Sequence, residues 1–197
     1  MNFSVNQIQE VLARKNYRFF DNEKPYNLNI IGIRSNNPIS NSFDDSLYLI
    51  YRDESLNLLN HRFEVTTDPG AYWLKNPLNV DGTAVLVPGQ YRGSHEIRKH
   101  QGKYEALCQK APVKVWRDNN KDLNIDTDGK IHEGIFGINI HRSNAQGEST
   151  VVEKWSAGCT VFKKVAEFNV FMDLCHKASK RYGNSFTYTL LEEKDFS

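Results

Sequence analysis

The hydrophobic pattern changes its period shortly after Cys159, and this change constrains the fold more than any other feature. Downstream, the apolar residues fall on one helical stripe that ends before Gly183, a residue type that stops helices: Val165, Phe168, Phe171, Leu174, Cys175, Ala178 and Tyr182. Upstream, short stretches rich in β-forming residues are separated by turn signals. The sequence therefore predicts a mainly β chain of the α+β class, with one long helix after Cys159.

The predicted strands are short and spread along the chain. They cover residues 27–34, 46–52, 56–68, 83–87, 112–118, 135–141 and 186–191. A helix is expected over residues 5–15, because Ser4 is a good N-terminal cap and the following apolar residues have helical spacing. No repeat or long linker divides the chain. We expect residues 1–197 to form a single domain in which residues 1–25 are an N-terminal helical extension.

The composition argues against several classes of protein. Hydrophobic residues make up 39% of the chain, enough for a core, and the net charge of +1 gives no support for binding to nucleic acid or to a membrane. The polar N-terminus does not resemble a secretory signal peptide, so we expect a protein made in the cytoplasm. The three cysteines, Cys108, Cys159 and Cys175, are too few for a disulfide framework, and we expect three free thiols.

The segment that ends at Cys159 holds the strongest functional signal. The small residues Ser156, Ala157 and Gly158 directly precede Cys159, and His141 ends an upstream run that is predicted to be a strand. Histidine is the usual base that converts a thiol to a thiolate near neutral pH. A glycine before the nucleophile lets backbone N–H groups approach a developing oxyanion. The pattern indicates a cysteine acyl-transfer site.

These residues resemble the catalytic motif of the L,D-transpeptidase (YkuD-like) family, which has a histidine and, after a gap of similar length, Ser/Thr-His-Gly-Cys. The matching residues are His141, Ser156, Gly158 and Cys159, and the resemblance is close over residues 134–162. The sequence departs from the family at three places. Ala157 replaces the usual histidine, Arg142 stands where glycine or serine is common, and residues 160–162 lack the arginine or asparagine often found there. These departures favour a divergent branch of the kind found in phage proteins and secreted antibacterial effectors.

The resemblance implies a β-sandwich-like domain with the nucleophile at the edge of a sheet, and a reaction on peptidoglycan stem peptides. His141 would take the proton of Cys159, and the backbone N–H groups of Gly158 and Cys159 would hold the oxyanion. Ser156 would fix the turn. The ring of His141 would be oriented by a backbone carbonyl near Arg142 or Ser143, or by the Ser143 hydroxyl.

The resemblance leaves the end of the reaction open. Water or an amine would resolve the thioester, so L,D-carboxypeptidase, endopeptidase and transpeptidase activities are all compatible with the motif. A protein made without a signal peptide would stay cytoplasmic until phage lysis or a secretion system delivered it to the cell wall.

Two other classes of function stay open, and the oligomeric state is not specified. A non-catalytic wall-binding or structural module could keep the same fold, with Cys159 as a buried inert thiol. A cysteine amidase with a similar dyad is a weaker alternative. In papain-like enzymes the cysteine precedes the histidine, whereas here His141 precedes Cys159.

The polar and aromatic segment from residue 91 to residue 104 is a candidate loop over the site. Arginine binds carboxylates in a bidentate manner, so such a loop could offer cations to a stem-peptide carboxylate. The candidate substrate-binding residues are Tyr91, Arg92, His100, Tyr104 and Arg142. The alternative is a solvated loop without a functional part.

No metal or other cofactor is expected. Residues 118–129 alternate oxygen-bearing side chains like a calcium loop, but Leu123 and Gly129 stand where an EF-hand needs glycine and glutamate. We therefore predict an acidic hairpin loop there. The histidines form no zinc-binding motif; they are His61, His95, His100, His132, His141 and His176.

Overall fold

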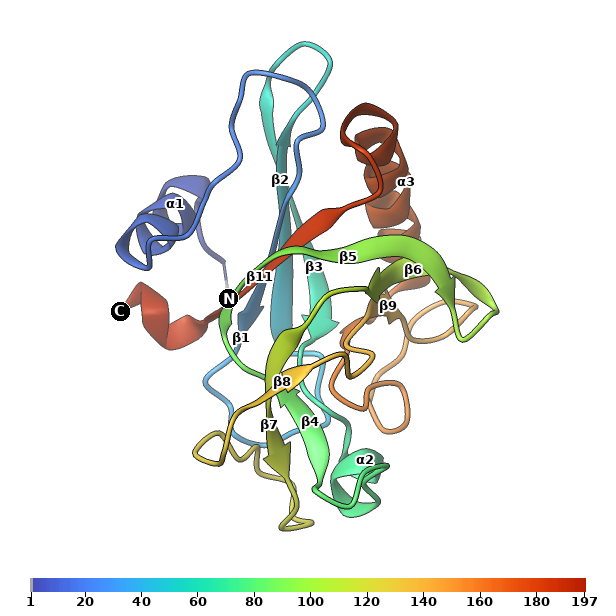
Figure 1. The fold of residues 1–197 in the computed structure, drawn as a ribbon. Coiled ribbons are helices and arrows are strands. Elements are labelled where there is room, and N and C mark those ends of the chain that lie inside the picture. The colour runs from blue at the N-terminus through green and yellow to red at the C-terminus, as the bar shows by residue number, and fades with distance from the viewer. Residues whose placement is uncertain (1) are drawn as a thin grey trace.

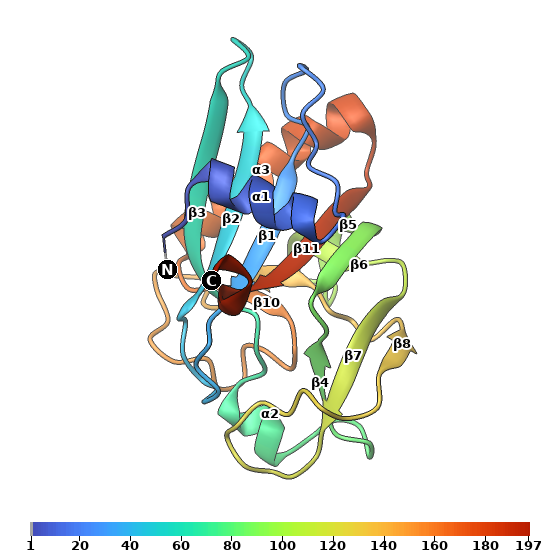
Figure 2. The ribbon, with the colours of Figure 1, turned by 90° about the vertical axis from the view of Figure 1, so that its left-hand side faces the viewer.

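The computed structural model describes residues 2–197, which form two β-sheets and three α-helices (Figure 1). The larger sheet is a closed eight-stranded barrel with the strand order β1-β11-β5-β6-β9-β10-β3-β2. The smaller sheet has three strands in the order β4-β7-β8 and lies at one end of the barrel (Figures 1 and 2). The prediction of a mainly β fold with few helices is confirmed.

The barrel strands are β1 (Asn29–Arg34), β2 (Asp45–Arg52), β3 (Leu58–Thr66), β5 (Gly89–His100), β6 (Tyr104–Gln109), β9 (Ile140–Arg142), β10 (Thr160–Phe162) and β11 (Phe186–Glu192). The smaller sheet consists of β4 (Thr83–Leu86), β7 (Val113–Asp118) and β8 (His132–Gly134). The helices are α1 (Val5–Arg14), α2 (Ala71–Lys75), α3 (Val165–Tyr182) and the short 3₁₀ helix η1 (Glu193–Phe196).

The closure of the large sheet corrects the expectation of a plain β-sandwich. Strand β1 pairs with β2 on one side and with the last strand, β11, on the other. The β1–β11 pairing is parallel and joins the two ends of the chain, so the sheet has no free edge there. Strand pairing between residues so far apart in the chain leaves no local signal in the sequence.

Helix α3 has the position and the apolar face that the sequence predicts. Its residues Phe168 and Phe171 are buried and belong to the same core as the inward-facing residues of the barrel. Phe162 of β10 lies against both of them, with ring centroids 5.5 and 5.1 Å away. This packing fixes β10, the strand that directly follows Cys159, against α3.

Helix α1 covers the outer face of the barrel on the side opposite α3 (Figures 1 and 2). It begins as predicted, because the Ser4 hydroxyl accepts a hydrogen bond from the Gln7 N–H and the Gln7 side chain accepts one from the Ser4 N–H. Its buried residues pack against outward-facing residues such as Ile31 and Tyr48. Strands β1 and β2 are therefore apolar on both faces and do not alternate.

Two predicted segments differ in the structure. Residues 91–104 are not a loop: they form most of β5, a short turn and the start of β6. The predicted strand over residues 135–141 is regular only from Ile140. Before it, the Gln109 side-chain carbonyl accepts hydrogen bonds from the N–H groups of Phe136 and Ile138, at 3.0 and 2.9 Å, in place of a neighbouring strand. Ladder pairing does not require apolar side chains, which is why the polar strand β5 was missed.

Other sequence predictions are confirmed. Residues 119–131 connect the antiparallel strands β7 and β8, so the acidic segment is a hairpin loop. Cys108, Cys159 and Cys175 are free thiols, and all three are buried. No helix within residues 2–197 is long and apolar enough to cross a membrane.

Candidate active site

Cys159 and His141 lie on the same face of two neighbouring parallel strands. Strand β9 places His141 opposite Val161 of β10. Residues two apart on a strand share a face, so Cys159, which precedes Val161 by two residues, points to the same side as His141 and lies about 7 Å back along the strand direction. Both residues line one cavity of about 490 Å³. The barrel thus brings the predicted nucleophile and base together.

The ring of His141 is buried and held through one nitrogen. Its Nδ1 lies 2.8 Å from the Arg142 carbonyl oxygen, so Nδ1–H donates to this carbonyl and Nε2 is left without the proton. The Tyr104 hydroxyl donates to the same carbonyl at 3.2 Å and lies 3.3 Å from Nδ1. The His100 ring stacks on His141 with centroids 4.2 Å apart. Of the orienting groups considered from the sequence, the Arg142 carbonyl occupies the position.

Burial keeps His141 neutral. Removal from water is the main cause that lowers the pKa of His141 to about 3, and the neighbouring His100 lowers it further. The hydrogen bond to the Arg142 carbonyl acts in the opposite direction. The imidazole is therefore uncharged at neutral pH, as a general base must be.

The Cys159 thiol is also neutral, and it does not hydrogen-bond to His141. Its Sγ donates to the Gly137 carbonyl at 3.3 Å and accepts from the Asn139 N–H at 3.4 Å. Burial raises the pKa of Cys159 to about 11, against the opposing effect of the Asn139 N–H. The residue is only 9% exposed. The thiol would have to turn away from Gly137 to reach His141.

The turn before Cys159 is fixed by Ser156. The Ser156 hydroxyl donates to the Cys159 carbonyl at 2.8 Å and accepts from the Gly158 N–H at 3.2 Å. This corrects the expected oxyanion site, because the Gly158 N–H already has a partner. The Cys159 N–H has no acceptor within residues 2–197 and is the donor that remains for an oxyanion.

Gly158 is required at its position for two reasons. Its φ of +113° is a backbone conformation that other residues rarely adopt. A Cβ at this position would also lie 2.2 Å from the Ala84 carbonyl oxygen. The turn is therefore in close contact with β4 of the smaller sheet.

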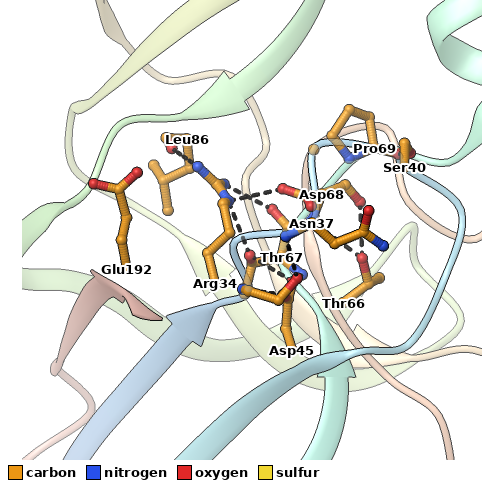
Figure 3. Close-up of polar contacts among 12 residues, drawn as sticks. Arg34, Asn37, Ser40, Asp45, Thr66, Thr67, Asp68, Pro69, Leu86 and Glu192 are labelled. Atoms are coloured by element: carbon orange, nitrogen blue, oxygen red, sulfur yellow. Dashed lines mark hydrogen bonds and ion pairs between the residues drawn. The ribbon is translucent and has the colours of Figure 1, made fainter. Parts of the chain in front are cut away.

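A buried polar cluster supports the other side of the turn. The Gly70 N–H donates to the Ser156 carbonyl at 2.8 Å. Just before Gly70, Asp68 forms an ion pair with Arg34, which also donates to the Leu86 and Thr67 carbonyls (Figure 3). These contacts fix the segment that carries Gly70.

The same cluster contains a second buried carboxyl group. Asp45 accepts from the N–H and the hydroxyl of Thr67 at 2.6 and 2.8 Å (Figure 3). Burial and the nearby Asp68 raise the pKa of Asp45 to about 8. Arg34 thus faces two acidic groups that water does not reach.

Only some of the predicted substrate-binding residues lie near His141. His100 and Tyr104 contact His141, and the Arg142 guanidinium lies 4.0 Å from the centroid of the Tyr104 ring. Tyr91 and Arg92 lie near the opposite end of β5, and the Tyr91 hydroxyl donates to the Val87 carbonyl. Eight residues of extended strand between residues 92 and 100 correspond to about 26 Å. Neither residue lines the cavity.

Ser143 does not orient the ring of His141, as the resemblance had allowed. Its hydroxyl donates to the Lys163 carbonyl at 3.2 Å and not to His141. Its N–H donates to the Phe162 carbonyl, which extends the pairing of β9 with β10. Ser143 therefore has a structural part next to the site.

Several cavity residues were missed from the sequence. They are Trp73 in the middle of α2, Arg117 on β7, Phe136, and Lys154 and Trp155 before the turn. Trp155 and Lys154 directly precede the motif in the sequence, and this position could have identified them as residues near the site. The others come from distant parts of the chain and carry no motif of their own.

No group of three or more His, Cys, Asp or Glu residues within residues 2–197 is arranged to hold a metal ion. In the acidic loop, the Asp118 carboxylate accepts from the Asp126 N–H at 3.0 Å, as in a backbone-stabilised turn. No family model, curated protein or solved structure matches the chain.

Proposed function

We propose that this protein is a cysteine-dependent hydrolase or acyltransferase of peptidoglycan stem peptides, similar in type to the L,D-transpeptidases. The observation that carries the proposal is the state of His141. Its Nδ1–H is held by the Arg142 carbonyl, which leaves Nε2 as the basic nitrogen in the cavity that also contains Cys159. A thiol and an oriented base on one face of a sheet are the minimal parts of such an enzyme.

In the proposed reaction, Cys159 Sγ turns from the Gly137 carbonyl, gives its proton to His141 Nε2 and attacks the peptide carbonyl carbon. The Cys159 N–H donates to the oxyanion, and one such donor contributes about 3 kcal/mol to transition-state stabilisation. The oxyanion then collapses, the C–N bond breaks and the amine leaves with the proton from His141. Water or an acceptor amine attacks the thioester, the C–S bond breaks and the thiol regains a proton.

The neutral state of both groups fits a thiol that is activated only with substrate present. Burial raises the pKa of Cys159 and lowers that of His141, so a thiolate–imidazolium pair is disfavoured in the empty site. The proton would move together with the attack on the carbonyl. Such a thiol is protected from oxidation while no substrate is bound, because the thiolate is the reactive form.

A non-catalytic wall-binding module is the second candidate. The observation that favours it is the hydrogen bond from Cys159 Sγ to the Gly137 carbonyl, in a residue that is largely buried. A thiol that stayed in this position would be inert. The two candidates share the cavity and differ in whether Cys159 reacts.

The test is incubation of the purified protein with muropeptides, followed by mass spectrometry of the products. Release of terminal D-alanine supports carboxypeptidase activity, and cleaved or new cross-links support endopeptidase or transpeptidase activity. Cys159→Ala and His141→Ala should abolish any such product in protein that remains folded by circular dichroism, although loss of the buried His141 ring should lower the thermal unfolding temperature. Cys108→Ala is the matched control, because this buried cysteine does not line the cavity.

Two results would contradict the enzyme. Full activity of Cys159→Ala would exclude the thioester mechanism. Binding of the wild-type protein to cell walls without any product would favour the non-catalytic module.

A further inference from the structure

The cavity around Cys159 is lined by positive charges without negative ones. Arg117 and Lys154 line it, and no aspartate or glutamate of residues 2–197 does. A second cavity of about 430 Å³ shares His141 and Lys154 with the first, and it adds Lys103 and Arg142, again without an acidic residue. Because the whole chain has a net charge of only +1, this is a local excess of positive charge. A groove of one charge sign favours a ligand of the opposite sign.

Arg117 is positioned next to the nucleophile turn by backbone contacts. On the smaller sheet, Arg117 of β7 pairs with Ala84 of β4, and the Ala84 carbonyl lies against Gly158. Gly158 directly precedes Cys159, so this contact adjoins the thiol-bearing residue. The position of Arg117 relative to Cys159 is therefore fixed by the pairing of β7 with β4 and by the contact of β4 with Gly158.

The guanidinium of Arg117 has unused hydrogen-bonding capacity. One of its terminal nitrogens, Nη1, donates to the Gly82 carbonyl at 3.1 Å, and its carbon lies 4.9 Å from the centroid of the Phe136 ring. Its Nε is buried and has no acceptor, whereas Nη2 is not fully buried and also has none, and no carboxylate within residues 2–197 pairs with the guanidinium. The terminal nitrogens of Arg117 are therefore the donors available to a ligand in the cavity.

Lys154, two residues before Ser156, adds a second cation to the lining of the cavity. Its ammonium group lies 4.2 Å from the centroid of the Tyr72 ring and forms no ion pair within residues 2–197. Its carbonyl accepts from the Trp73 indole at 3.1 Å, which holds the backbone in place. Burial is the main cause that lowers the pKa of His100, and the positive charges of Lys103 and Arg142 lower it further.

We infer that Arg117 is a specificity-determining residue of this cavity, which binds the carboxylate of the residue directly beyond the bond that Cys159 attacks. The inference rests on the proposed function and names its substrate class. Arginine can bind a carboxylate through two parallel N–H donors, which fixes the orientation as well as the charge of the ligand. A terminal carboxylate bound by Arg117 would place the last amide bond of the peptide near Cys159. The activity expected from this geometry is release of the terminal residue.

The test compares a stem tetrapeptide that ends in a free D-alanine with the same peptide as its C-terminal amide. The wild-type protein should have a kcat/KM at least about 10-fold higher for the acid, because a charge-assisted bidentate contact is lost with the amide. Arg117→Gln should lose about 10- to 100-fold on the acid and little on the amide. Arg117→Lys should retain part of the preference, and Arg18→Gln, an exposed arginine outside both cavities, should retain all of it. Equal kcat/KM values of the wild type for acid and amide, or equal losses of Arg117→Gln on both, would overturn the inference.

A binding measurement separates this inference from the proposed chemistry. Calorimetry with the Cys159→Ala variant should show tighter binding of the acid than of the amide, and the difference should vanish in Cys159→Ala/Arg117→Gln. If this holds while the wild type releases no product, the proposed chemistry is wrong and the carboxylate site stands. Turnover without discrimination between acid and amide leaves the chemistry in place and overturns the carboxylate site. The absence of both turnover and peptide binding would overturn the proposed chemistry and the carboxylate site together.

Discussion

Arg34 and Asp68 form a buried ion pair at 2.7 Å, with side chains only 6% and 7% exposed (Figure 3). Arg34 also donates to two carbonyls, so its charge is well solvated by the protein. Two residues after Asp68, the Gly70 N–H donates to the Ser156 carbonyl. The ion pair and the nucleophile turn are thus parts of one continuous structure.

Replacing Arg34 should destabilise the whole protein. In Arg34→Met, Asp68 keeps its burial but loses its partner, and breaking one side of a buried pair costs about 3–5 kcal/mol. We expect a loss of that size in the free energy of unfolding measured with urea. Arg52→Met, which breaks the partly exposed pair with Asp21, is the matched control and should have a much smaller effect. Similar losses in the two variants would contradict the importance of the buried cluster.

The same cluster predicts how stability depends on pH. The folded protein raises the pKa of Asp45 from 3.8 to about 8, so between these values the folded state holds a proton that the unfolded state has released. The contribution of Asp45 to stability should therefore fall as the pH rises from about 4 to about 8. Burial lowers the pKa of His141 to about 3 and that of His95 to about 4, so these two groups act in the opposite direction below about pH 6.5. Thermal unfolding at pH 5 and pH 8 should therefore show a larger loss, or a smaller gain, of stability with pH in the wild type than in Asp45→Asn. The same change with pH in both proteins would contradict the raised pKa of Asp45.

Substitution of Gly158 should deform the nucleophile turn. Gly158→Ala forces alanine into a conformation reserved for glycine, which costs at least about 1–2 kcal/mol, and it also brings a Cβ against the Ala84 carbonyl. We expect loss of activity and a lower unfolding temperature. Gly147→Ala is the matched control, because Gly147 has a φ of +88° but nothing within 4 Å of an added Cβ. It should show the backbone cost alone, and equal effects of both variants would exclude the contact as the cause.

The thiol of the unliganded protein should react slowly at neutral pH. The thiolate is the reactive form, and burial raises the pKa of Cys159 to about 11. Alkylation of the Cys159 peptide by iodoacetamide, followed by mass spectrometry, should accelerate with pH up to about 11. A midpoint below about pH 8, an ordinary value for an exposed thiol, would show that Cys159 is already activated without substrate.

The Tyr104 hydroxyl should act on the position of His141. Tyr104→Phe keeps the ring that packs near His100 but removes the hydroxyl that contacts both Nδ1 of His141 and the Arg142 carbonyl. If the proposed reaction occurs, kcat should fall by about 3- to 10-fold, the value of one neutral hydrogen bond, with KM unchanged. Tyr182→Phe, whose hydroxyl donates to the distant Pro25 carbonyl, is the matched control. An increase in KM alone would point to a contact with substrate.

Local sequence features were sufficient for much of the fold. The cap at Ser4, the stripe that ends before Gly183 and the alternating run of β7 each depend on residues a few positions apart. Strand β5 was missed, because its polar side chains carry no alternation and its place is set by hydrogen bonds to β11 and β6. The closed barrel was missed for a related reason: the pairing of β1 with β11 joins the two ends of the chain.

For the candidate site, the sequence by itself determined the residue types at the centre: a cysteine after a small-residue turn, and an upstream histidine on a strand. The tertiary structure decided which residues lie close together and how far each one is buried. The parallel pairing of β9 with β10 placed His141 and Cys159 on one face, and burial set the pKa values of both. The smaller sheet brought Arg117 beside the turn, whereas Arg92 was left at the far end of β5. The physical reason is that a local stretch of sequence specifies which residue types are present. The distances between side chains, their solvation and the charges around them are set only when distant segments pack together.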